Sequence, residues 1–413
     1  MFKKQYLRRG ILVVMEQIEG VRSVSLGIWV KAGSRYESSG TNGIYHFLEH
    51  MFFKGTWKRS QKEIAFEIDS LGGDMNAFTS KETTVFYIKV LDEYLDRAIE
   101  LIMDIFISSR FPDEEIEKEK GIVVEEIRMV EDTPDDYVYD IFNEFVWSEN
   151  GLGYNILGTE ETVSSFRRND LIEHFERVYC PDNIVFSCAG NMEFDRLTEL
   201  LDGHSEGIVG GCGRVSPARP VFHEGVKAVE KDLSEVHICA GVEGIPQGSP
   251  DRYAMLLVNT ILGSGVSSRL FQEIREKRGM AYSVYSFVTS YVDTGLFGVY
   301  VGTSKRYYRE VIDLIKTEMT GFRDTVTEEE LERARSHLKG NLILALESTS
   351  GRMNNLARQE IYYGRYYSPS EVMDSIDGVS LNGLRELADR LFSERKFAVT
   401  LLGPVEEAEL LTS

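Results

Sequence analysis

The chain has 413 residues, of which 42% are hydrophobic and 27% are charged, a composition typical of soluble globular proteins. Its formal net charge of −21 argues against nucleic acids and anionic membrane surfaces as partners, and it favours basic or unstructured peptides. A single hydrophobic core rarely grows to serve a chain of this length, so two domains are expected.

The sequence predicts a cytoplasmic protein. The apolar run at residues 11–15 is too short for a secretory signal, and no stretch approaches the length of a membrane span. The cysteines contain no Cys-x-x-Cys pair, so a thiolate zinc site is not expected. They are interpreted as small buried residues in a reducing compartment, and they are Cys180, Cys188, Cys212 and Cys239.

The first half of the chain is predicted to alternate strands and amphipathic helices. Residues 11–16 and 24–32 are expected to form a hairpin, followed by a helix at 41–53. A capping box, Ser60-x-x-Glu63, opens a second helix that ends at Gly72-Gly73. The remaining elements are strands at 74–79, 83–90 and 183–189 and helices at 94–107, from 112 to about 129, at 137–147, 171–179 and 196–201.

Two histidines and a glutamate share one face of the predicted helix at residues 41–53. His46 and His50 are four residues apart and Glu49 precedes the second, so the three side chains are neighbours on a helix. Neutral imidazole is a common zinc ligand, and a carboxylate beside zinc-bound water can accept its proton. A single histidine on an apolar face is usually a core residue, but three residues at these fixed positions favour a metal site. The order His-x-x-Glu-His is the inverzincin signature.

A zinc ion that keeps one position for water needs a third protein ligand. The other five histidines have no ligand spacing, so the acid-rich helix after Pro112 is the better source. Glu119 and Glu126 lie two turns apart on one face of this helix, and Glu125 points about 100° away from Glu126. One of these carboxylates can bind the metal while another orients a histidine through its second ring nitrogen. A solvated acidic face is the alternative, and spacing alone leaves the choice open.

The second half of the chain repeats the plan of the first. Residues 24–29 match residues 237–242 at an offset of 213, and residues 171, 179 and 190 have counterparts at the same offset. The fold class is therefore predicted to be α+β, with two homologous domains from an internal duplication, each a mainly antiparallel sheet packed with helices. We expect a catalytic zinc-binding domain at residues 1–208, a glycine-rich linker at 209–221 and a metal-free domain at 222–413.

The repeat fails at the metal motif. Adding 213 to the positions of the three motif residues leads to Asn259, Leu262 and Gly263, which do not form a zinc site. One domain is thus expected to carry the chemistry while the other helps to bind.

Several motifs together resemble one enzyme family. His46-Phe47-Leu48-Glu49-His50, followed 76 positions after His50 by Glu126, resembles the pitrilysin/insulinase family of zinc metallopeptidases, and most closely its processing-peptidase branch. The resemblance covers essentially the whole chain and implies a pitrilysin-like metallopeptidase fold. Its other motifs are Gly72-Gly73-x-x-Asn76-Ala77-x-Thr79-Ser80, Glu119-x6-Glu126, Leu262-Gly263-x-Gly265-x-Ser267-Ser268-Arg269-Leu270-Phe271 and Arg275-x6-Tyr282.

The resemblance implies a role for each matching residue in the first half. His46, His50 and Glu126 would bind one zinc ion per chain. Glu49 would be the general base that takes a proton from the attacking water. Glu119 would be a supporting carboxylate close to the ligands.

The resemblance also implies how a peptide is held. Asn76 and Ala77 would lie on an edge strand that pairs with the extended substrate. Arg275 and Tyr282, from the second domain, would contact the substrate carbonyl and stabilise the tetrahedral intermediate. Taken alone, an arginine and a tyrosine are more often a surface ion pair and a core aromatic.

These expectations describe a zinc endopeptidase that acts on extended or unfolded peptides inside a chamber. A chain of this length resembles half of the larger family members, so a homodimer is expected to complete the chamber. A heterodimer with a metal-free homologue is the alternative for assembly. The alternatives for function are a catalytically silent structural or assembly subunit and a peptide-binding partner.

Overall fold

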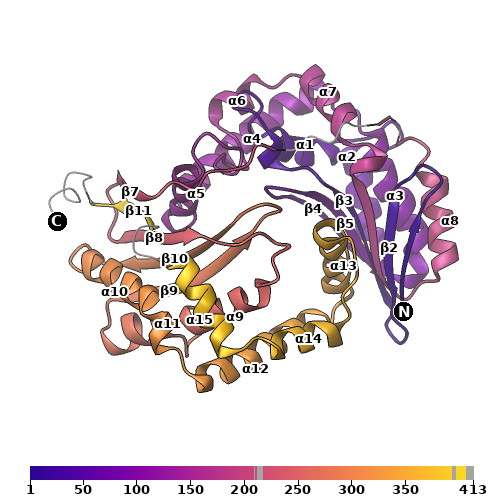
Figure 1. Ribbon diagram of the computed structural model, residues 1–413. Helices are drawn as coiled ribbons and strands as arrows, with labels where there is room; N and C mark the ends of the chain where they lie inside the picture. The colour runs from indigo at the N-terminus through magenta and orange to yellow at the C-terminus, as the bar shows by residue number, and fades with distance from the viewer. Residues whose placement is uncertain (209, 212–216, 393–396, 406–413) are drawn as a thin grey trace. The chain divides into compact units, whose positions relative to one another are not determined.

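The computed structural model describes residues 1–208, 210–211, 217–392 and 397–405. The chain divides into two compact units, each built around one sheet (Figure 1). The first unit holds residues 1–129, 154–218 and 345–366, and the second holds residues 130–153, 219–344 and 367–413. Among the described residues, no helix has the length and apolar character needed to cross a membrane.

The first unit contains a six-stranded sheet in the order β1-β2-β6-β3-β5-β4. Strands β2 and β6 run parallel, and the other neighbours are antiparallel. The strands are β1 (Phe2–Tyr6), β2 (Leu12–Gln17), β3 (Ser23–Val30), β4 (Asp74–Thr79), β5 (Thr84–Leu91) and β6 (Ile184–Gly190). The helices are α1 (Ile44–Phe52), α2 (Gln61–Leu71), α3 (Leu95–Ser108), α4 (Asp113–Glu131), α6 (Glu160–Ser165), α7 (Arg168–Val178), α8 (Phe194–His204) and α13 (Thr349–Tyr363).

Both faces of this sheet are covered. One face packs with α1, α3, α7 and α8 into the larger core, and α13 covers β2, β3 and β6 on the other face (Figure 1). Side chains of a strand point alternately to the two faces, so Ile28 enters the larger core while Trp29 packs against Met353 of α13. The central strands are consequently buried along almost their whole length.

The second unit contains a five-stranded sheet in the order β7-β11-β8-β10-β9, with β7 and β11 parallel. The strands are β7 (Gly225–Glu230), β8 (Val236–Glu243), β9 (Ala281–Ser290), β10 (Gly295–Thr303) and β11 (Ala398–Gly403). Helix α5 (Pro134–Val146) packs on one face against β8 and β11, and α9, α10 and α15 pack on the other. The other helices of this unit are α9 (Arg252–Leu262), α10 (Tyr308–Thr320), α11 (Phe322–Thr325), α12 (Glu328–Ala345), α14 (Pro369–Asp377) and α15 (Leu381–Leu391).

The two sheets confirm the predicted α+β fold and its duplication. Strands β2, β6, β3, β5 and β4 correspond in order to β7, β11, β8, β10 and β9, including the parallel pair. Helix α9 occupies the place of α1 in the repeat. Its Asn259 accepts a hydrogen bond from the Ser286 hydroxyl at 2.7 Å, so the position equivalent to His46 is used for packing.

The compact units differ from the predicted domains at 1–208 and 222–413, because each half of the chain contributes one helix to the other unit. Helix α13 belongs to the first unit although it comes from the second half of the chain, and α5 belongs to the second unit although it comes from the first half. Each helix covers a face of the sheet formed by the other half of the chain. Residues 209 and 212–216 of the expected linker at 209–221 lie outside the described residues.

One expectation about local structure is wrong, and one strand is missing from the predicted elements. Strands β2 and β3 do not form a hairpin, because β6 lies between them and pairs with both. Nothing in the local sequence indicates that a fully buried strand from residues 184–190 will take the central position. Strand β1 was not predicted, since most of its side chains are exposed and show no alternation of apolar and polar residues.

The cysteines agree only in part with the expectation of free buried thiols. Cys188 and Cys239 are free and buried, but Cys180 is disulfide-bonded. Cys212 lies outside the described residues.

Candidate metal centre

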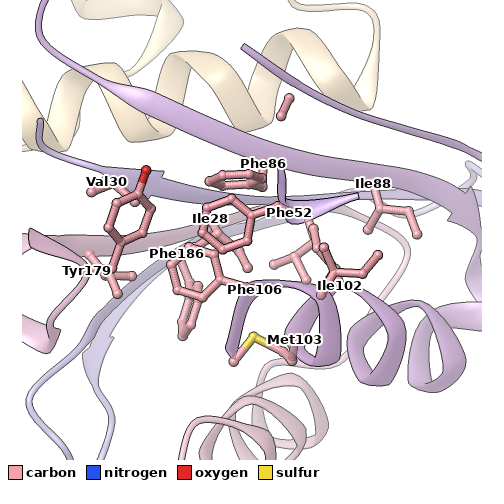
Figure 2. Packing of buried hydrophobic residues seen from close by; sticks show 14 of the residues in the cluster. Ile28, Val30, Phe52, Phe86, Ile88, Ile102, Met103, Phe106, Tyr179 and Phe186 are labelled. Carbon is pink, nitrogen blue, oxygen red and sulfur yellow. The ribbon is translucent and has the colours of Figure 1, made fainter. Parts of the chain in front are cut away.

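Helix α1 is fixed to the core of the first unit by its apolar side. Phe47, Leu48, Met51 and Phe52 are all fully buried, and they recur at the three- and four-residue spacing of an amphipathic helix. Figure 2 shows Phe52, the last residue of α1, packed among aromatic rings. The centroid of the Phe52 ring lies 4.7 Å from that of Phe86, 5.5 Å from that of Tyr179 and 5.9 Å from that of Phe106. This packing gives the polar side of α1 a fixed orientation.

The first turn of α1 is capped by a carboxylate from outside the helix. The N-cap residue, Gly43, has φ of 91° and offers no side-chain acceptor. Instead Glu37 accepts from the backbone N–H of Gly43 at 2.8 Å and of Tyr45 at 3.1 Å, and from the Asn42 amide at 2.9 Å. Burial raises the pKa of Glu37 to about 7, although these donors favour its charged form. The cap fixes the turn in which His46 lies.

His46, His50 and Glu126 converge as the family resemblance implies. The Nε2 atoms of His46 and His50 lie 3.8 and 3.7 Å from the same Glu126 oxygen, Oε2. Among the described residues, this is the one group of three potential metal ligands whose atoms all lie within 4.8 Å of one another. Tetrahedral zinc with ligand bonds of about 2.0–2.1 Å needs ligand atoms about 3.3 Å apart. The group therefore fits a zinc ion with only small side-chain shifts.

The electrostatics of the histidines suit metal binding. Burial, and then the neighbouring His50, lower the pKa of His46 to about 3, so His46 is a neutral imidazole at physiological pH. Burial alone would lower the pKa of His50, but the hydrogen bond and the charge of Glu119 raise it. Neutral imidazole is the form that binds zinc, and a carboxylate on the second ring nitrogen makes it a better ligand.

Glu119 has the supporting position implied by the family resemblance. Its Oε1 lies 2.7 Å from His50 Nδ1 and its Oε2 lies 2.6 Å from Lys54 Nζ. Burial alone would raise the pKa of Glu119, but the hydrogen bonds from His50 and Lys54 lower it. Glu125, the weaker candidate for the metal, instead pairs with Arg128 at 2.7 Å and is exposed. The structure thus separates the roles of Glu119 and Glu125, which the spacing in the sequence could not.

Glu49 lies on the same side of α1 and is held by a residue that sequence reasoning did not single out. The Thr79 hydroxyl donates to Glu49 Oε2 at 2.6 Å. Burial raises the pKa of Glu49, and this hydrogen bond opposes the rise. Thr79 ends strand β4 and had appeared only as one letter of a longer motif. Its contact brings the carboxylate next to the strand expected to bind substrate.

Asn76 and Ala77 lie on β4, which is an edge strand of the six-stranded sheet. The Ala77 N–H donates to the Asn76 side-chain oxygen at 2.8 Å. An edge strand offers unpaired backbone groups to an additional strand. The position of these residues at an edge is as predicted.

Arg275 and Tyr282 lie together in the second unit. Arg275 belongs to the π-helical turn η4 (Phe271–Lys277), and Tyr282 is near the start of β9. The Arg275 guanidinium donates to the Tyr282 carbonyl at 2.8 Å and lies 4.6 Å from the centre of its ring. With 77% of its surface exposed, Tyr282 is not a core aromatic. Arg275 is partly buried, with 34% of its side chain exposed.

Comparison with known proteins identifies the family. A family model described as Insulinase (Peptidase family M16) matches residues 12–160, and one described as Peptidase M16 inactive domain matches residues 165–338. The protein named uncharacterized zinc protease YmxG of Bacillus subtilis is 40% identical over 407 residues, which cover 98% of each chain. The chain belongs to peptidase family M16. An uncharacterized zinc protease of Streptomyces coelicolor is 35% identical to this M16 chain over 420 residues, covering 98% of it and 90% of the relative.

Solved structures show the same fold for this M16 chain. A protease from Helicobacter pylori superposes with a TM-score of 0.91 at 22% identity and covers 98% of this chain and 99% of its own. A Pseudomonas fluorescens structure described as a peptidase M16 inactive domain gives a TM-score of 0.92 at 18% identity, with 98% of both chains covered. The duplicated α+β fold is therefore that of M16 peptidases.

Proposed function

We propose that this M16 protein is a zinc-dependent endopeptidase that hydrolyses extended or unfolded peptides inside a chamber. The observation that carries the proposal is the convergence of His46, His50 and Glu126, with Glu49 beside them on the same face of α1. Relatives at 35–40% identity over almost the full chain are named zinc proteases. The model described as an inactive domain matches only the part of the chain that starts at residue 165, beyond all four of these residues.

In the proposed mechanism, His46, His50 and Glu126 hold one zinc ion. When bound, zinc lowers the pKa of a coordinated water to about 7 and polarises the substrate carbonyl. Glu49 accepts the proton of the attacking water and passes it to the leaving amine. Thr79 holds the Glu49 carboxylate in place by donating its hydroxyl to Oε2, which orients Glu49 for its role as the general base. Glu119 holds His50 in position through Nδ1.

The peptide is proposed to add to the open edge of β4 beside Asn76 and Ala77. Main-chain pairing at an edge strand tolerates many side chains, which suits unfolded substrates. The Ala77 N–H, which bonds to the Asn76 side chain, would change its partner when a peptide strand binds. Arg275 and Tyr282 are proposed to donate to the oxygen that becomes negative during attack. The exposure of Tyr282 and its contact with Arg275 support this role.

The test is hydrolysis of a quenched fluorescent peptide together with metal analysis of the purified chain. We expect about one zinc per chain, loss of activity when a chelator removes it, and recovery when zinc is returned. A protein that binds zinc but cleaves none of a set of unstructured peptides would instead be the silent structural subunit or the peptide-binding partner. The intact set of four residues favours the enzyme over these alternatives, because a scaffold has no need of it.

We also propose that the chain forms a homodimer, since it carries both the zinc motif and the pair Arg275 and Tyr282. Light scattering of the purified chain should then give twice its mass of 47.0 kDa. A stable monomer with full activity would contradict the dimer, and activity that appears only with a second, metal-free homologue would favour the heterodimer. The cytoplasmic location remains a prediction.

A further inference from the structure

Lys54 is the first residue beyond the C-cap of α1, and its side chain turns back toward the metal centre. Its backbone N–H donates to the Met51 carbonyl at 3.2 Å, which continues the last turn of the helix. Only 14% of its side chain is exposed, and its Nζ lies 2.6 Å from Glu119 Oε2. Lysine is seldom buried unless it is paired, so this contact accounts for its position.

The Glu119 carboxylate divides its two oxygens between Lys54 and His50. Oε1 meets His50 Nδ1 at 2.7 Å and Oε2 meets Lys54 Nζ at 2.6 Å. The Glu119 side chain is only 3% exposed. Among the ion pairs of the described chain, Lys54 is the only partner of Glu119 that carries a permanent charge. A buried carboxylate that loses such a partner is left with an uncompensated charge.

We propose that Lys54 is a positioning residue of the metal centre, which holds the Glu119 carboxylate against His50 Nδ1 and thereby fixes the ring that binds zinc. The inference rests on the proposed metal site and adds a residue to it. With both oxygens held, the carboxylate has one orientation in which Oε1 points at Nδ1. Without Lys54 only the bond to His50 remains, and the carboxylate is free to rotate away from it. Outer partners of this kind typically contribute 10–100-fold to metal affinity.

The alternative is that Lys54 stabilises helix α1 directly, independently of Glu119. A cation near a helix C-terminus stabilises the helix through its dipole. The two roles differ in one measurable way. If Lys54 acts through Glu119, replacing Lys54 does not lower the zinc affinity further in a protein whose Glu119 has already been replaced. If Lys54 acts on the helix, its removal has the same effect whether or not Glu119 is intact. A double-mutant cycle separates these cases.

The experiment measures zinc affinity by competition with a chelating dye, so it does not depend on peptidase activity. The proteins are the wild type, Lys54→Met, Glu119→Gln and the double variant. We expect Lys54→Met to weaken zinc binding about 10–100-fold and the double variant to lie within about threefold of Glu119→Gln. Lys58→Met is the matched control, because Lys58 is an exposed lysine four residues further on that pairs with Glu100, and it should bind zinc as the wild type does.

Two results would overturn the proposal. One is a Lys54→Met protein that binds zinc within twofold of the wild type. The other is a loss of zinc affinity on Lys54→Met that is as large in the Glu119→Gln protein as in the wild type. Thermal unfolding of the metal-free proteins checks that each is folded, and Lys54→Arg, which keeps the charge, should retain most of the affinity if Lys54→Met does not fold. A wild-type protein that does not bind zinc would contradict the proposed function itself, and this outcome is distinct from either of the others.

Discussion

Replacing Glu49 with glutamine is expected to leave zinc bound and to lower the turnover number about 10²–10⁴-fold, the usual contribution of a general base. Glutamine has the shape of glutamate but cannot take a proton from water. The Thr79 hydroxyl can still donate to the side-chain oxygen of glutamine, so the new side chain should keep its place. The three metal ligands are unchanged, and zinc content per chain should equal that of the wild type. Metal analysis and hydrolysis of a quenched peptide measure the two effects on one sample.

Glu125→Gln provides the matched control for this experiment. It makes the same chemical change one position away from a metal ligand, on an exposed side chain that pairs with Arg128. Its activity should stay within about twofold of the wild type, since exposed ion pairs contribute little. If Glu49→Gln retained wild-type turnover, Glu49 would not be the base, and another group would have to accept the proton.

The sequence predicts the part of the site that lies on one helix. His46, Glu49 and His50 fall on one face of α1 because helical geometry fixes their spacing, and the apolar residues between them predict which side packs on the sheet. Glu126 depends on how α4 approaches α1, which is a tertiary contact. Spacing within α4 could not distinguish Glu119, Glu125 and Glu126, and only the family resemblance selected among them.

Residues that support the site were missed for the same physical reason. Thr79 contacts Glu49 from 30 positions along the chain, and Lys54 reaches Glu119 across 65 positions. Each is an ordinary polar residue in its local sequence, and its role appears only when a strand or a second helix packs beside α1. Glu37 is similar, because nothing in its neighbourhood indicates that it caps a helix six residues later.

The topology of the two sheets could likewise be predicted only in part. The duplication was visible because equal offsets survive in both halves of the chain, and the two sheets confirm it strand by strand. The insertion of β6 between β2 and β3, and the exchange of α5 and α13 between units, were not visible. Both features depend on contacts between segments that are distant in the sequence. The local pattern of apolar and polar residues does not show which sheet face or edge such a segment will cover.

Replacing His50 with alanine should remove zinc together with activity. Structural zinc sites contribute about 10–16 kcal/mol, or roughly 3 kcal/mol for each of four ligands, so the loss of one should weaken binding by about two to three orders of magnitude. The change also removes the partner of Glu119 Oε1, which leaves that buried carboxylate with Lys54 alone. The measurement is zinc retained after dialysis against a weak chelator, with peptide hydrolysis on the same sample.

His204→Ala is the control, because His204 lies at the end of α8 outside the metal group and its loss should change neither quantity. Comparison of His50→Ala with Glu49→Gln then separates binding of the metal from use of the water. Both variants should have strongly reduced activity, but only His50→Ala should lose its zinc in the dialysis. If His50→Ala kept a full complement of zinc, the metal would be bound elsewhere. The convergence of His46, His50 and Glu126 would then have to be explained as packing of a buried polar cluster.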